Sequence, residues 1–84
     1  MFIPQENDDV VLLFDAKPNR NVNGKVVKVR GKFILVEFRL WSSKKLTRSW
    51  FPRLSDDCFG AHVKEKSIVG DEWYSVYPTN ADLS

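Results

Sequence analysis

The chain has 84 residues, 43% of them hydrophobic and 29% charged, which predicts one folded domain over residues 1–84 with a single modest core. No apolar run approaches the roughly 18 residues of a membrane span, and the acidic start of the chain is unlike a secretory signal. Cys58 is the only cysteine and His62 the only histidine, so we expect no disulfide, metal or cofactor, and a reducing intracellular compartment.

Charge is distributed unevenly along the chain. Residues 17–53 hold eleven lysines and arginines but one acid, Glu37, so this segment carries +10. Residues 1–16 and residues 54–84 each carry −4. A basic middle between acidic ends indicates an anionic partner, such as a nucleic acid or an acidic protein. The alternative is that the acidic ends fold back onto the basic segment and neutralise it.

The first predicted strands lie on either side of a loop. Residues 10–14 form a short apolar run with β-branched residues, which predicts a strand, and residues 15–23 carry turn-forming residues. Residues 25–30 follow as a second strand. Two valines of this strand alternate with two cations, as expected for a strand with one buried face: Val27 and Val29 with Lys28 and Arg30.

A glycine turn leads into the third predicted strand. Gly31 between two basic residues predicts a hairpin, and the next strand covers residues 33–40. Residues 41–45 form a basic loop, and a fourth strand over residues 46–51 ends at Pro52, which has no N–H to donate. Alternation along the third strand predicts its core face: Ile34, Val36 and Phe38.

The last part of the chain carries weaker signals. Residues 54–60 are expected to turn, with room for one helical turn, and residues 63–69 resemble a strand weakly. A last strand is predicted over residues 72–77, ended by Pro78, and residues 79–84 are expected to form a flexible tail.

Together these segments predict an all-β fold. Five to six short antiparallel strands over about residues 8–78 are typical of a small, strongly bent barrel. No segment supplies the helix that an OB-fold usually places between its third and fourth strands. We therefore expect an SH3-like barrel.

The aromatic residues fall into two groups. Phe14, Phe33 and Phe38 lie within strand patterns and are predicted to be in the core. A second group flanks the basic loop, where exposed rings beside cations could stack on bases or on cationic groups. The alternative is that these rings pack across one end of the barrel. This second group consists of Trp41, Trp50 and Phe51.

The sequence offers little for catalysis. Cys58 and His62 could meet only in a helix, but Gly60 lies between them and neighbouring acids disfavour a thiolate. Adjacent carboxylates, such as Asp56 and Asp57, point to opposite faces of a strand. The sequence also lacks a phosphate-binding glycine loop and a metal-binding motif. We therefore predict no catalytic residue and no enzymatic activity.

Parts of residues 10–54 resemble the chromatin "royal" barrels, a group that includes chromo barrel, Tudor and MBT domains. The resemblance rests on an apolar first strand, a valine-rich second strand, a third strand ending in F-x-x-W, and a second tryptophan after a short loop. The matching segments are VLLF at 11–14, KVVKV at 25–29, ILVEFRLW at 34–41, and Trp50.

This resemblance implies an aromatic cage that holds a methylated lysine of a histone-like tail. By position, the cage would consist of Phe38, Trp41 and Trp50, with Phe14 or Phe51 as a further wall. Here Arg48 and Ser49 precede the second tryptophan, where the family often has an acid. Some relatives bind DNA or RNA instead, and the basic segment fits that function better.

Two functions therefore remain open for an intracellular protein, nuclear in a eukaryote and otherwise cytoplasmic. The first is a non-enzymatic module that binds nucleic acid or chromatin with low sequence specificity. The second is a protein-interaction module, either a reader of methylated or acidic tails or a small adaptor or inhibitor subunit. For the first, the predicted phosphate contacts are Lys28, Arg30, Lys32, Arg39, Lys44, Lys45 and Arg48.

Overall fold

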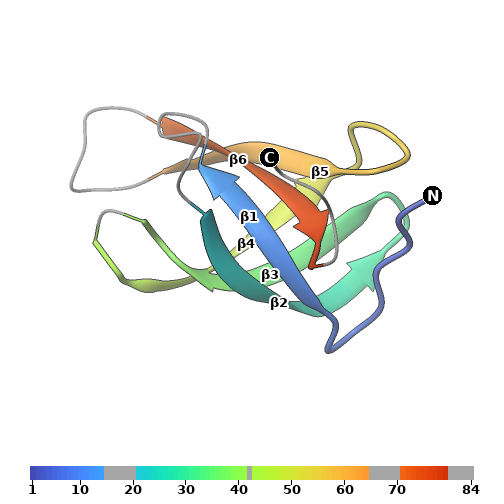
Figure 1. Cartoon of the computed structure of the whole chain (residues 1–84), viewed down its shortest axis with the longest axis horizontal. Coiled ribbons are helices and arrows are strands. Elements are labelled where there is room, and N and C mark those ends of the chain that lie inside the picture. Colours follow the sequence, from blue (N-terminus) through green and yellow to red (C-terminus); the bar gives the residue numbers. More distant parts are fainter. Residues whose placement is uncertain (15–20, 42, 65–70, 80–84) are drawn as a thin grey trace.

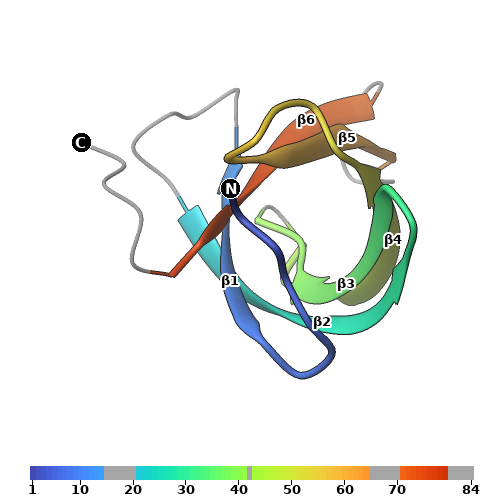
Figure 2. The ribbon, with the colours of Figure 1, turned by 90° about the vertical axis from the view of Figure 1, so that its right-hand side faces the viewer.

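Six antiparallel strands form one barrel-shaped sheet in the computed structural model, which describes residues 1–14, 21–41, 43–64 and 71–79 (Figure 1). The strand order is β4-β3-β2-β1-β6-β5, and an isolated bridge between Arg53 and Phe59 links the two edges (Figure 2). The prediction of a small all-β barrel is confirmed. The strands are β1 (Asp9–Phe14), β2 (Asn21–Arg30), β3 (Phe33–Arg39), β4 (Leu46–Pro52), β5 (Phe59–Lys64) and β6 (Asp71–Pro78).

The largest error in the predicted elements concerns β5. This strand covers Phe59–Lys64, whereas the sequence predicted a turn up to Gly60 and a strand over 63–69; residues 65–70 lie outside the described part of the chain. Gly60 is buried in the strand, where a Cβ would lie 2.7 Å from the Trp73 ring and 2.8 Å from a Leu54 methyl. The glycine therefore allows close packing of side chains.

Three other predictions need correction or lie outside the described residues. β2 begins at Asn21, four residues before the predicted start, because residues 21–25 pair with β1. Residues 54–58 form no helical turn. The predicted tail lies mostly outside the described residues, which include only Thr79 of it.

The core is built from the inward faces of all six strands. Phe14 and Phe38 are buried as predicted, but Phe33 is 49% exposed, because it alternates with the inward Ile34. Tyr74 packs against both buried phenylalanine rings, with centroid distances of 5.1 and 5.2 Å. The buried apolar residues are Val10, Leu12, Phe14, Val26, Ile34, Val36, Phe38, Leu40, Phe51, Phe59, Val63, Tyr74 and Val76.

The N-terminal segment crosses one end of the barrel (Figure 2). The Phe2 ring packs edge-on against Phe59 at 5.8 Å, and the backbone N–H of Phe2 donates to the Asp56 carbonyl at 2.7 Å. Arg53 donates to the Phe2 carbonyl at 2.6 Å, and its guanidinium lies over the Phe59 ring. Arg53 therefore has a structural role at this end of the barrel.

A β-bulge at Val27 sets the orientation of the second half of β2. Val26 pairs with Val36 and Lys28 pairs with Leu35, so Val27 has no partner on β3. With regular pairing, Lys28 would lie on the same face as the buried Val26. The extra residue moves the lysine to the outer face of the sheet.

We expect Gly24→Ala to destabilise the barrel. Gly24 faces the core, and a Cβ there would lie 2.7 Å from Leu12 Cδ1 and 3.0 Å from Val36 Cγ1. Overpacking of this kind lowers the free energy of unfolding by about 1–3 kcal/mol, which chemical denaturation can measure. In a Leu12→Ala background the same change should cost less, because the colliding methyl is gone. Equal costs in the two backgrounds would contradict the steric explanation.

Candidate functional site

The seven predicted phosphate-binding cations are all exposed, and six of them form two groups of three at opposite ends of β3. Lys28 and Arg30 lie at the end of β2, and Lys32 lies in the turn that follows. Arg39 ends β3, and Lys44 and Lys45 lie in the loop that leads to β4. Arg48 is on β4 between the two groups.

The outer faces of β2, β3 and β4 form one continuous surface, which we call the outer face. Directly paired residues of antiparallel strands share a face, so the register defines its rows. Arg30 pairs with Phe33, and Phe33 with Pro52. The next two rows are Lys28–Leu35–Trp50 and Lys25–Glu37–Arg48.

The third row of the outer face is an ion-pair strip. Arg48 Nε lies 2.7 Å from a Glu37 carboxylate oxygen, and Lys25 Nζ lies 3.9 Å from Asp9 on β1. Charges therefore alternate in sign along this row. Its net charge is close to neutral, which leaves the excess of positive charge at the two ends of β3.

The other predicted cations have no carboxylate within ion-pair distance among the described residues. The acidic ends of the chain supply one such partner there, Asp9, and its cation is Lys25. Within the described part of the chain, the neutralisation that the sequence left open is therefore limited to this one ion pair. Other described acids lie in the N-terminal segment, the β4–β5 loop and β6: Glu6, Asp8, Asp56, Asp57 and Glu72.

The aromatic cage predicted from the family resemblance is not formed. Phe38 and Phe51 are 2% and 0% exposed, and their rings contact each other at 5.8 Å inside the core. Phe14, proposed as a further wall, is buried too. These three side chains alternate inward along their strands and have no surface to offer a ligand.

The two predicted tryptophans lie far apart. Trp50 is on the outer face opposite Leu35, whereas Trp41 follows the end of β3, six residues further along. At about 3.3 Å per residue, this separation is about 20 Å. Trp41 is half-buried against the core, its backbone N–H donates to the Tyr74 hydroxyl at 3.0 Å, and Lys44 Nζ lies 4.1 Å from its ring centroid.

Trp50 has two neighbours on the outer face, and the sequence analysis did not assign one of them, Phe33, to the site. It is 39% exposed, and the Arg30 guanidinium lies 5.8 Å from its ring centroid. Phe33, predicted to be in the core, is a diagonal neighbour of Trp50 on the same face. The alternation around Ile34 contained this signal, because it places Phe33 opposite the core.

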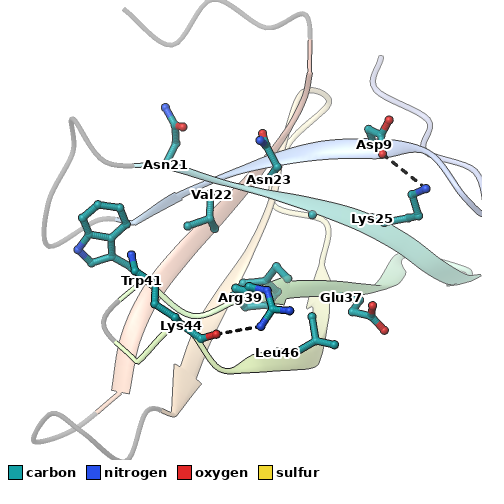
Figure 3. A pocket seen from close by; sticks show the side chains of 12 residues that line it. Asp9, Asn21, Val22, Asn23, Lys25, Glu37, Arg39, Trp41, Lys44 and Leu46 are labelled. Carbon is teal, nitrogen blue, oxygen red and sulfur yellow. Dashed lines mark hydrogen bonds and ion pairs between the residues drawn. The ribbon is translucent and has the colours of Figure 1, made fainter.

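An open groove of about 600 Å³ lies where β2 and β3 diverge (Figure 3). Pairing between the two strands ends at Gly24 and Phe38, so the first residues of β2 pair with β1 alone. Asn21, Val22 and Asn23 line one side of the groove, and Arg39, Trp41 and Lys44 line the other. The groove therefore combines amides, cations and one indole.

The chemically reactive side chains have ordinary packing partners. Cys58 Sγ lies 3.3 Å from the Ser55 hydroxyl, and the His62 ring packs edge-on against Trp73 at 5.0 Å. Within the described residues, no three His, Cys, Asp or Glu side chains are grouped to hold a metal ion. The same part of the chain contains no apolar helix with the length needed to cross a bilayer.

Comparison of the chain with protein-family models, with curated proteins and with solved structures finds no match in any of the three. The resemblance to the royal barrels therefore stays a prediction that rests on the segments quoted above. The geometry of the outer face remains the basis for a functional proposal.

Proposed function

We propose that the protein is a non-enzymatic nucleic-acid-binding module that uses the outer face of β2, β3 and β4. The observation that carries the proposal is the group of Lys28, Arg30 and Lys32, three exposed cations without a described carboxylate partner. One of the three, Arg30, has its guanidinium 5.8 Å from the ring centroid of the half-exposed Trp50. Cations in such an arrangement attract phosphates and release the counterions bound to them.

The proposed binding has low sequence specificity. Phosphate contacts position a nucleic acid but carry no sequence information. The described residues contain no helix that could enter a major groove, and the outer face is a curved sheet. A module of this kind would act on DNA, RNA or chromatin, in the nucleus of a eukaryote or otherwise in the cytoplasm.

A second candidate function is protein interaction through a strand edge. β4 pairs with β3 along its length, but on its other side the only bridge among the described residues is that between Arg53 and Phe59. The N–H and C=O groups of residues 46–50 thus have an open side to which an extended peptide could add. A variant without the cations Lys28, Arg30 and Lys32 should still bind a peptide at that edge. This outcome distinguishes the second candidate function from the first.

Replacing Lys28, Arg30 and Lys32 together by Gln is expected to weaken binding to short oligonucleotides and to flatten its salt dependence. Each lost phosphate contact lowers the slope of log K against log salt by roughly 0.7–0.9, so three lower it by about 2–3. Fluorescence anisotropy over a series of NaCl concentrations measures both effects.

The matched control is Lys25→Gln, which removes a cation already paired with Asp9. It should lower the salt slope by less than a third of the change seen in the triple variant. Thermal unfolding should show that all variants fold, since exposed substitutions usually change stability by less than about 0.5 kcal/mol. A parent protein whose affinity for oligonucleotides does not change with salt would rule out the proposal.

Glu37→Gln is expected to strengthen oligonucleotide binding by roughly 2- to 5-fold at low salt. Glu37 is the acid in the middle of the outer face, and its removal frees Arg48 from an ion pair of 2.7 Å. Such exposed pairs are worth about 0.2–1 kcal/mol and are screened by salt, so the gain should shrink as salt rises.

Glu72→Gln on β6 is the control for Glu37→Gln, because it adds the same net charge on a strand separated from β3 by β2 and β1. It should leave the affinity almost unchanged. Weaker binding by Glu37→Gln would instead mean that Glu37 holds Arg48 in a position that the ligand needs.

A further inference from the structure

The outer face separates its cations from its aromatic rings. Along the two rows nearest the β2–β3 turn, the cations Lys28 and Arg30 are on β2. The aromatic residues Phe33 and Trp50 are on β3 and β4, and Leu35 lies between Lys28 and Trp50 in the second row. One edge of this surface is therefore positively charged, and the part next to it is apolar and aromatic.

Both rings are accessible to a ligand. Phe33 is 49% exposed and Trp50 is 39% exposed, whereas most other aromatic side chains on the described strands pack inward or against neighbours. As diagonal neighbours across an antiparallel pair, the two residues lie roughly 7–8 Å apart. That spacing lets each ring stack on a different base of one extended strand.

Arg30 connects the charged edge with the rings. Its guanidinium lies 5.8 Å from the centroid of the Trp50 ring, at the outer limit of a cation–π contact. A base that stacks on this face of the indole takes the place of the guanidinium, which then hydrogen-bonds the neighbouring phosphate. The contact thus places a phosphate donor next to the aromatic surface.

We propose that this surface selects single-stranded nucleic acid over duplex. A single strand presents phosphates along one side and unpaired bases along the other, which matches cations on β2 and rings on β3 and β4. A duplex keeps its bases stacked inside and offers the surface only phosphates. Stacking is available to every base, so the selection does not require a particular sequence. This inference rests on the proposed function and names the substrate class of the same face.

The test compares a 5′-labelled single strand of mixed sequence with the duplex formed by the same strand, by fluorescence anisotropy at one salt concentration. The parent protein should bind the single strand at least several-fold more tightly. Trp50→Leu should weaken single-strand binding by roughly 5- to 150-fold, the effect of losing one stacked base, and change duplex binding by less than about 2-fold.

Two further variants separate stacking from folding and from apolar contact. Trp50→Phe keeps a ring and should retain most of the single-strand affinity, while Trp50→Leu keeps only apolar surface. Phe33→Ala should reproduce the loss independently of Trp50. Leu54→Ala removes a 50% exposed apolar side chain from the β4–β5 loop and serves as the matched control without effect.

The outcomes distinguish this inference from the proposed function. Salt-dependent binding of both probes with equal affinity, unaffected by Trp50→Leu, would overturn single-strand selection and leave nucleic-acid binding intact. Failure to bind either probe would overturn both. Probes of the same sequence as DNA and as RNA show which polymer the face prefers, and selection over the duplex by either one supports the inference.

Discussion

The unpaired residue at Val27 determines what β2 presents to solvent. Before the bulge, Val26 points into the core and is fully buried. A strand alternates with a period of two, so without an extra residue Lys28 would point inward as well, and Arg30 after it. An unpaired cation that pointed inward next to Val26 would lose its hydration, which is costly. The bulge avoids that cost and places both cations opposite Leu35 and Phe33 on the outer face.

The half-exposed rings of Phe33 and Trp50 beside those cations leave apolar surface in contact with water. Single exposed apolar residues are normal on a protein surface, but two aromatic neighbours with a flanking guanidinium form a patch. A monomer gains little by leaving Phe33 and Trp50 half exposed, because burial of either ring would be favourable. In the proposed function, a ligand that covers these rings would gain the free energy of burial that the free protein leaves unused.

Local sequence patterns predicted much of the fold, but they predicted only part of the candidate site. The alternation over 33–40 placed Ile34, Val36 and Phe38 inward correctly, and the glycine turn and the prolines that end β4 and β6 were correct boundaries. β5 was misplaced because a buried glycine resembles a turn residue when its neighbours Trp73 and Leu54 are unknown.

The prediction of an aromatic cage was wrong for a related reason. Motif spacing does not show on which side of a strand a ring points, and the alternation that sends Ile34 inward also buries Phe38. The same alternation sends Phe33 outward, where the motif gave it no role. The positions of the cations within the rows depend on the strand register and the bulge, neither of which can be read from the sequence pattern.

The register shows that positive charge is concentrated at the two ends of β3, which are about 20 Å apart, and that the strip between them is nearly neutral. A small anion would contact one end only, whereas a polymer of phosphates can contact both. The charge distribution therefore favours a long anionic ligand along β3, and the rings beside the Lys28 end favour one whose bases are unpaired.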